Sequence, residues 1–473
     1  MTKSDELTRL SARQAVAALK KKELKPLELM DAVIERIEKI DGAVNALPVR
    51  FFDQARAAAR AFSATDMERS PGWLAGLPFV AKEYNDVEGQ LTTYGSPLFK
   101  DSRAAKTDVS VGVLSNAGGI VMAKSNVPEF AGANTFNSVY GATRNPWDLR
   151  MSAGGSSGGA AAALASGTAW LAMGSDVGGS LRIPASYCGI VGMRPTPGRV
   201  ARGHGLLPFD PIWVEGPMAR TVDDLALMLD AQSAQVLDDP LSQPAPAVSF
   251  SEQLKEPQKG ARVAYSSNLG LAEVDKEVAD ITLAASKRLT EAGAEVSEDC
   301  PELVGAIDTF QTQRALLFAT LRGELVRKER DRIPASIVWN VEKGLSLTAD
   351  EVLRAERERA RLVQNMRLFF GRYDFLVCPT VSVPPFPVEK AYPTEINGQA
   401  MTTYIDWMSM TFVITVTGNP AISVPCGFTR NGLPVGLQIV GRHHSEGRLL
   451  AIAAQLEQIL GISPRLPVLP IAA

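Results

Sequence analysis

The sequence predicts a protein of the α/β class, and three segments carry that prediction. Apolar residues follow a helical spacing between residues 18 and 62, as in amphipathic helices. From Leu77 onward they come in short runs that end at Gly or Pro, which is typical of buried strands lying between helices. Residues 262–296 combine an apolar run, a long helical pattern and a second run, which we interpret as a β-α-β unit.

The individual elements follow in chain order. Two or three amphipathic helices are expected to open the chain, with a break near Asp41 and Gly42. A stretch rich in Pro and Gln makes residues 231–258 the best boundary or surface loop. Asn431 and Gly432 lie between two apolar runs, which favours a hairpin-like pair of strands with a longer loop. The other regular segments expected are strands at 77–81 and 119–123 and a solvated helix at 351–367.

Composition excludes several classes of protein. The net charge is −3, from 49 basic and 52 acidic residues, so no global field would hold nucleic acid. The N-terminus lacks the apolar core of a signal peptide, and no run reaches the ~18 apolar residues that a membrane span needs. Four cysteines without metal-ligand spacing fit reduced thiols and no metal site. We therefore expect a cytoplasmic protein with no membrane or nucleic-acid partner.

Residues 152–189 have the most unusual composition, because glycines, serines and alanines dominate there. Ser156 precedes an Ala-rich segment expected to form a helix as far as Gly167, and residues 168–173 are expected to form a strand. A helix of about nine residues advances ~14 Å, and a strand of five or six residues returns ~17–20 Å. The chain can therefore come back to Ser156 by the time it reaches Ser180.

This geometry would suit attack on an acyl group. Gly178 and Gly179 would let the backbone turn tightly and aim N–H groups at one point, as an oxyanion requires. Each feature alone also has a simpler interpretation: Ser156 or Ser157 as a helix cap, the two glycines as a plain turn, and Ser180 as the cap of the next segment.

Histidine offers little support as the base of such a site. The three histidines lie outside turn-rich motifs and away from any obvious nucleophile, so a Ser-His-Asp arrangement is poorly supported. They are His204, His443 and His444.

Several segments, in a fixed order, resemble the amidase signature family. Two of them are the glycine- and serine-rich run at 154–159 and the segment GSDVGGSLRIPA at 174–185. The resemblance extends from about residue 26 to 460, through segments at 76–83, 124–130, 194–199, 216–220 and 432–438. It implies an α/β/α sandwich around a large mixed β-sheet, the amidase signature fold, and hydrolysis of a carboxylic amide to an acid plus ammonia or an amine.

The resemblance also implies roles for particular residues. Ser180 is the implied nucleophile, Ser156 the bridging serine after a cis peptide bond, and Lys82 the base. Because Lys82 follows the apolar run 77–81, burial is expected to favour its neutral amine. The implied oxyanion donors are the backbone N–H groups of Val177, Gly178, Gly179 and Ser180.

Other polar and aromatic residues have expected supporting roles. Asp176 and Arg182 are expected to orient the loop as an ion pair, and Ser157 to cap the helix. The substrate-binding candidates implied by the resemblance to the family's substrate-channel segment are Glu129, Phe130, Ala131, Gly132 and Phe136. Trp213 is a further candidate, as an aromatic wall of the pocket, with ordinary core packing as the alternative. No metal and no organic cofactor is expected.

The resulting hypothesis is a stand-alone enzyme with a small-molecule amide substrate. The alternative is the glutamine-hydrolysing subunit of an amidotransferase, although the segment 206–217 departs from the serine-rich sequence expected of such subunits. A binding protein on a decayed amidase scaffold is a further alternative. No association signal stands out, which leaves a homodimer open. We expect a single domain over 1–473, with N-terminal helices at 1–65, a core at 75–230, the loop at 231–258 and the remainder at 259–473.

Overall fold

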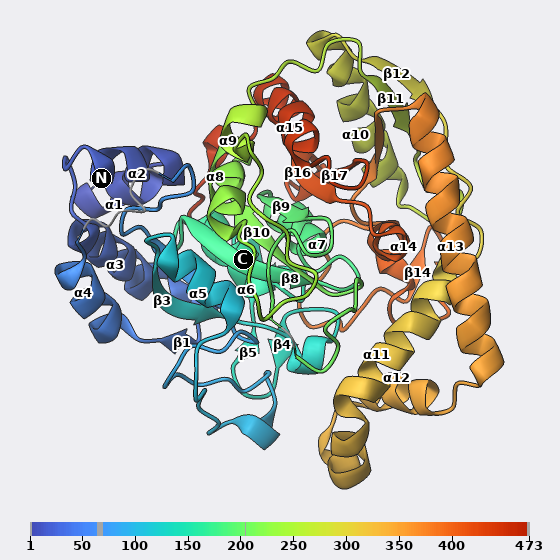
Figure 1. Cartoon of the computed structure of the whole chain (residues 1–473), viewed down its shortest axis with the longest axis horizontal. Helices are drawn as coiled ribbons and strands as arrows, with labels where there is room; N and C mark the ends of the chain where they lie inside the picture. Colours follow the sequence, from blue (N-terminus) through green and yellow to red (C-terminus); the bar gives the residue numbers. More distant parts are fainter. Residues whose placement is uncertain (1, 64–69, 204, 471–473) are drawn as a thin grey trace.

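A computed structural model describes residues 2–63, 70–203 and 205–470, and its centre is one mixed sheet of eleven strands (Figure 1). The predicted α/β class with a large mixed sheet is confirmed. In their order across the sheet, the strands are β1 (Val49–Arg50), β3 (Ile120–Ser125), β2 (Pro78–Lys82), β8 (Leu171–Asp176), β10 (Val214–Ala219), β9 (Val191–Arg194), β16 (Ala421–Phe428), β17 (Pro434–Val440), β13 (Phe375–Pro379), β11 (Arg262–Tyr265) and β12 (Glu295–Glu298).

The sheet changes direction where the candidate site lies. β2 is parallel to both β3 and β8, whereas β10 is antiparallel to β8 and to β9. The predicted β-α-β unit is confirmed, because β11 and β12 are parallel and helix α10 (Lys276–Lys287) joins them. The predicted hairpin is also confirmed as the antiparallel pair β16 and β17.

Four helices, rather than the two or three expected, open the described chain, and they lie together at one side of the molecule (Figure 1). They are α1 (Lys3–Arg9), α2 (Ala12–Lys20), α3 (Pro26–Val44) and α4 (Phe52–Ala61). α1 and α2 are short, but each begins with a capping box, formed by Thr2 with Asp5 and by Ser11 with Gln14. These caps supply the helix starts that the apolar spacing alone did not reveal.

The remaining helices pack around the sheet. α6 (Gly158–Ser166) contacts β2 and β8, and α7 (Arg182–Cys188) contacts β9, β16 and β17. The long helices α11 (Ala306–Glu329) and α13 (Ala349–Arg372) lie beside each other at the opposite side from the N-terminal helices (Figure 1). The others are α5 (Val109–Asn116), α8 (Val222–Gln232), α9 (Phe250–Gln253), α12 (Ala335–Leu345), α14 (Ser409–Thr417) and α15 (Glu446–Leu460).

Small pieces of strand complete the fold. They pair as β4 (Phe136–Asn137) with β5 (Gly141–Ala142), β6 (Arg144–Asn145) with β7 (Asp148–Ser152), and β14 (Glu395–Ile396) with β15 (Gln399–Ala400).

The expected loop at 231–258 is only partly irregular. α8 continues into it as far as Gln232, and α9 lies within it because the Asp230 carboxylate accepts hydrogen bonds from the amides of Phe250 and Ser251. The expected boundary at residue 65 lies outside the described residues. Strands from both ends of the chain belong to the same sheet, which thus connects the expected segments.

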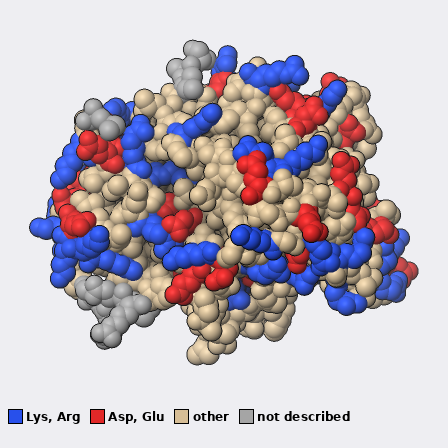
Figure 2. Space-filling model, turned by 90° about the horizontal axis from the view of Figure 1, so that it is seen from above, with Lys and Arg blue, Asp and Glu red and all other residues tan. Residues whose placement is uncertain are grey.

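Two properties of the described residues bear on possible partners. No helix among them is both long and apolar enough to cross a membrane. Basic and acidic side chains are interspersed on the face shown in Figure 2.

Candidate active site

Lys82 ends strand β2 inside the protein, with a side chain that is 0% exposed. Its Nζ lies 2.8 Å from Ser156 Oγ, 2.9 Å from Ser157 Oγ and 2.9 Å from Ser175 Oγ. Burial lowers the pKa of Lys82 to about 7, although the carboxylates of Glu215 and Asp176 act in the opposite direction. The expected burial of Lys82 is confirmed.

The three hydroxyl neighbours fit both charge states of this nitrogen. An ammonium can donate one proton to each hydroxyl, whereas a neutral amine donates two and keeps a lone pair that can accept a proton. A lysine whose pKa lies near neutrality can therefore exchange a proton with one of these serines. The same lysine at its ordinary pKa of ~10.4 would remain an ammonium at pH 7.

The glycines around Ser156 allow the backbone to pass close to other segments. A Cβ at Gly155 would lie 2.3 Å from the carbonyl oxygen of Ala133, and one at Gly158 would lie 2.3 Å from Thr135 Oγ1. The peptide bond between Gly155 and Ser156 is cis. The predicted excursion is confirmed, because α6 leaves this point and β8 returns parallel to β2.

Ser157 does not cap α6, contrary to expectation. Its side chain makes no capping hydrogen bond, because Thr135 Oγ1 already accepts a hydrogen bond of 3.0 Å from the amide of Gly158. The Ser157 hydroxyl lies against Lys82 Nζ instead.

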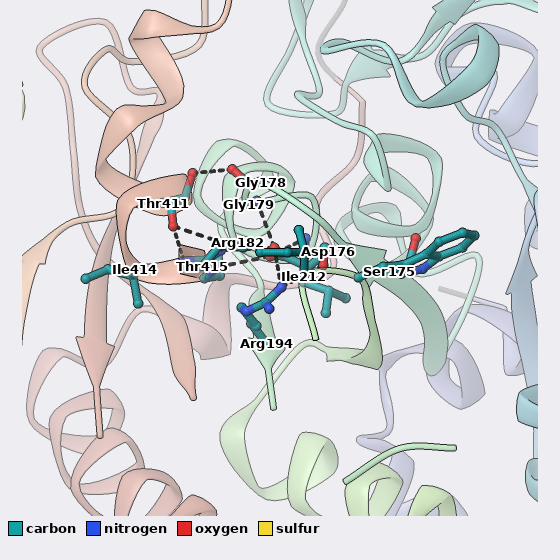
Figure 3. A network of polar contacts seen from close by, with 12 residues as sticks. Ser175, Asp176, Gly178, Gly179, Arg182, Arg194, Ile212, Thr411, Ile414 and Thr415 are labelled. Carbon is teal, nitrogen blue, oxygen red and sulfur yellow. Dashed lines mark hydrogen bonds and ion pairs between the residues drawn. The ribbon is translucent and has the colours of Figure 1, made fainter. Parts of the chain in front are cut away.

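Ser180 lies in the turn between β8 and α7, where it is partly exposed. Gly179 has a φ of +123°, which favours glycine, and a Cβ there would lie 2.2 Å from Thr411 Oγ1. The Thr411 hydroxyl lies 2.7 Å from the carbonyl oxygen of Gly178 (Figure 3). Helix α14 thus fixes the turn from the other side.

The backbone amides of this turn differ in whether they already have a hydrogen-bond acceptor. The Gly179 N–H, an expected oxyanion donor, instead donates to Asp176 Oδ1 at 2.8 Å. No acceptor for the amides of Val177, Gly178 and Ser180 is found among the described residues. The motif could not reveal this difference, because it depends on the side-chain conformation of Asp176.

Asp176 holds the turn through buried ion pairs (Figure 3). Its carboxylate lies 3.0 Å from Arg182 Nη2, which confirms the predicted pair, and 3.3 Å from Arg194 Nη1. Burial alone would raise the pKa of Asp176, but the two guanidinium groups outweigh it and lower this pKa to about 2. Arg182 also donates to Gln438 Oε1 at 2.6 Å, so β17 is tied to the turn as well.

Sequence reasoning missed two residues beside Lys82. Ser175 is on β8. Its partner on the antiparallel strand β10 is Glu215, which is 2% exposed. Burial raises the pKa of Glu215 to about 7, although Lys82 acts in the opposite direction. A carboxylate inside the apolar strand VEGPMA is a signal that could have identified Glu215.

The substrate-binding candidates at 129–132 are connected to Lys82 through Tyr84. The Tyr84 ring lies 5.1 Å from Lys82 Nζ, and its hydroxyl oxygen accepts a hydrogen bond of 2.7 Å from the Ala131 amide. Glu129 is partly buried, Phe130 is buried against the Phe99 ring, and Gly132 ends the short turn.

The other two candidates differ in their surroundings. Phe136 is 62% exposed on β4. Trp213 is partly buried, and its Nε1 donates to Glu215 Oε1 at 3.2 Å. Trp213 thus contacts Glu215, a carboxyl whose charge acts on Lys82.

The described histidines have other surroundings. The His443 ring lies 2.9 Å from the carbonyl oxygen of Thr417, and His204 lies outside the described residues. Among the described residues, no group of three or more His, Cys, Asp or Glu side chains could hold a metal ion.

Comparison with known proteins assigns the family. The profile of the family described as Amidase matches residues 28–450. An acylamidase of Rhodococcus erythropolis is 37% identical over 459 residues, covering 95% of each chain. A glutamyl-tRNA(Gln) amidotransferase subunit of Moorella thermoacetica is 35% identical, covering 99% of this chain and 100% of that one. A solved bacterial aryl acylamidase gives a TM-score of 0.88 at 29% identity, covering 97% of this chain and 99% of that one.

The chain therefore belongs to the amidase signature family, and it is a hydrolase of carbon–nitrogen amide bonds.

Proposed function

We propose that this chain hydrolyses a carboxylic amide through an ester formed on Ser180, with Ser156 and Lys82 moving the proton. The observation that carries the proposal is the 2.8 Å contact between Lys82 Nζ and Ser156 Oγ in a fully buried setting. The lowered pKa of Lys82 supports it, because a neutral amine is the form that accepts a proton.

In the first half of the proposed reaction, Ser180 Oγ attacks the carbonyl carbon of the amide. Its proton passes to Ser156 Oγ as the proton of Ser156 passes to Lys82 Nζ, and the carbonyl electron pair moves onto oxygen. The free amides of Val177, Gly178 and Ser180 are the proposed donors to this oxyanion. The carbon–nitrogen bond then breaks, and the departing nitrogen takes the proton back along the same serine.

In the second half, water attacks the Ser180 ester by the reverse relay. Lys82 accepts the proton of water through Ser156, the carbon–oxygen bond to Ser180 breaks, and Ser180 Oγ regains the proton. The acid leaves and the neutral lysine is restored. Each half returns Lys82 to its starting state, so the relay needs no cofactor.

The proposed substrate is a small and largely apolar amide. A pocket of about 440 Å³ has Phe412 in its wall, and Phe412 stacks on Phe310, whose ring would lie 3.0 Å from a Cβ at Gly178. The pocket therefore lies beside the proposed oxyanion site. Apolar and polar groups both line it, among them Leu271, Ile307, Met401, Asn268 and Asp406. Such a mixed lining suits an aryl or alkyl acyl group that carries one amide.

A second candidate is the glutamine-hydrolysing subunit of an amidotransferase, because relatives with that name match the chain from end to end. The segment 206–217 favours the first candidate, since it presents Leu206 and Phe209, which are 71% and 69% exposed, where a serine-rich sequence was expected of such a subunit. The four free cysteines support our proposal that the protein works in a reducing compartment such as the cytoplasm.

Assays on the purified chain alone distinguish the candidates. We expect amine release from an anilide or a simple aliphatic amide, and no ammonia release from glutamine. Release from glutamine alone would favour the amidotransferase subunit. Release from none of these substrates would favour a binding protein on this fold.

Substitutions then test the assigned roles. Ser180→Ala and Lys82→Met are expected to lower kcat at least about 10³-fold, because each removes one member of a relay that acts as a unit. Lys124→Met is the matched control, since Lys124 is also a buried lysine whose pKa is lowered, to about 8, but its Nζ contacts Thr92 Oγ1 and no candidate nucleophile. Full activity of Ser180→Ala would remove Ser180 as the nucleophile.

A further inference from the structure

The proposed reaction creates a positive charge on Lys82, inside the protein, where burial disfavours a charge. When Lys82 accepts a proton it becomes an ammonium, although its side chain is 0% exposed. A buried cation is costly unless an anion lies near enough to compensate it. The carboxylates of Asp176 and Glu215 are the two acidic groups that interact with Lys82.

Asp176 is already committed to other cations. Its two oxygens accept hydrogen bonds from Arg182 Nε and Nη2 at 3.0 Å, and Arg194 Nη1 lies 3.3 Å from Oδ1. Two guanidinium groups thus surround one carboxylate, so the cluster as a whole carries a positive charge. Asp176 still favours the charged form of Lys82, but it does so less than Glu215, and its own charge is already balanced by the two arginines.

Glu215 lies on the same face of the sheet as Ser175, and one of its carboxylate oxygens has no hydrogen-bond partner among the described residues. Directly opposite residues of an antiparallel pair share a face, so Glu215 projects to the same side as Ser175, whose hydroxyl accepts from Lys82. Glu215 Oε1 accepts from Trp213 Nε1, but Oε2 is buried and has no partner within the described parts of the chain. An unpaired buried carboxylate oxygen is rare enough to need an explanation.

The other charged groups around this carboxyl do not neutralise it. Asp108, at the start of α5, faces Glu215 with the same charge. Arg202 faces it with the opposite charge, but its Nη2 donates to the carbonyl oxygens of Leu207 and Asp210. Lys82 contributes most among the cations that act on Glu215.

We propose that Glu215 is a positioning residue whose carboxylate is the counter-charge for the ammonium that forms on Lys82 during amide hydrolysis. The inference rests on the proposed function. Glu215 acts through Lys82 and not on the substrate: it stabilises the state in which the proton has left the serines. Trp213, by donating to Oε1, keeps the carboxyl in place.

The pH dependence of kcat/KM tests this role. Activity rises with pH as the ammonium of Lys82 loses its proton, and a nearby carboxylate opposes that loss. Glu215→Gln removes the carboxylate, so the acid limb of the profile is expected to move to lower pH by about one unit. On the plateau kcat is expected to fall about three- to tenfold, because the amine is a weaker base. KM for a non-titrating anilide should change little.

Glu457→Gln is the matched control. Burial also raises the pKa of Glu457 to about 7, but this residue is on α15 and its charged neighbours are Asp223 and Asp224, not Lys82. The same substitution there should leave the acid limb in place. If Glu215→Gln lowers the melting temperature and leaves the acid limb where it was, Glu215 is structural and the inference is wrong.

The aspartate variant gives a second reading. Glu215→Asp keeps the charge on a shorter side chain, so its acid limb should lie between those of the wild type and Glu215→Gln. An acid limb that coincides with that of Glu215→Gln would contradict the counter-charge role. Failure of the proposed function looks different, because Lys82→Met or Ser180→Ala would then remain active whatever Glu215 does.

Discussion

At the scale of single residues, the three hydroxyls around Lys82 Nζ have different tasks. Ser156 lies within the glycine- and serine-rich run at 154–159 and is the proposed member of the proton relay. Ser157 and Ser175 accept from the same nitrogen at 2.9 Å, and neither belongs to the proposed relay. Because Ser157 and Ser175 take two of the bonding directions of Lys82 Nζ, the third direction points at Ser156. We infer that they orient the lysine.

Ser175→Ala tests this orienting role. The variant removes one acceptor of a charged hydrogen bond, worth about 1.5–3 kcal/mol, so kcat is expected to fall at least about tenfold with little change in KM. Steady-state kinetics on an anilide measures both constants. Ser186→Ala is the control, because the buried Ser186 hydroxyl accepts from the Gly436 amide and not from Lys82. Equal loss of kcat in both variants would mean a general packing effect.

Some of these residues were predictable and others were not. The burial of Lys82 followed from the apolar run before it, which is a local signal. The contact of Ser157 with Lys82 was not predictable, because Thr135 takes the capping position and lies more than twenty residues away in the chain. Glu215 matched no motif, and its place in the site comes from strand pairing, because it lies opposite Ser175, whose hydroxyl contacts Lys82.

At the scale of elements, the turn from β8 to α7 is held from several directions. Asp176 accepts from the amides of Gly179 and Leu181, and Thr411 on α14 contacts the Gly178 carbonyl oxygen. The proposed nucleophile therefore stands on a turn fixed by its own strand and by a helix more than 200 residues further along the chain. Such a framework keeps the free amides aimed at one point.

Gly179→Ala should disturb this turn strongly. The methyl group would meet Thr411 Oγ1 at 2.2 Å, and the φ of +123° disfavours any side chain, so we expect a loss of more than about 2 kcal/mol in stability. We also expect kcat to fall at least about tenfold, as the adjacent amides shift. Chemical denaturation and kinetics measure the two effects.

Gly89→Ala separates backbone strain from the steric clash. Gly89 has a φ of +76°, and nothing lies within 4 Å of a Cβ built there. This variant should lose only about 1 kcal/mol and keep its activity. If Gly179→Ala behaves like Gly89→Ala, the contact with α14 does not fix the turn.

Elements were easier to predict than their arrangement. The excursion from Ser156 through α6 and β8 depends on helix and strand lengths, which short-range spacing reveals. The position of β9 between β10 and β16 could not be derived, because it pairs residues 192–194 with residues 421–423. Strand order of this kind is decided by packing across the whole core.

At the scale of the whole molecule, one sheet joins the two parts of the chain on either side of the 231–258 segment. β9 comes from the first part and β16 from the second, and they pair directly. α7, which follows Ser180, packs on β16 and β17. Arg182 also donates to Gln438 on β17, so the proposed site depends on both parts. By contrast, Ala247 and Val248 in the connecting segment are exposed.

This arrangement predicts the behaviour of a split protein. Fragments 1–247 and 248–473, produced together, should associate and retain amidase activity, because the break falls at an exposed site and no strand is cut. Each fragment produced alone should fail to fold, since β9 or β16 would be left as an unpaired, apolar edge. Co-purification through a tag on one fragment, followed by the anilide assay, measures both outcomes. A monomeric, cooperatively folded 1–247 fragment would instead show that the first part is a domain of its own.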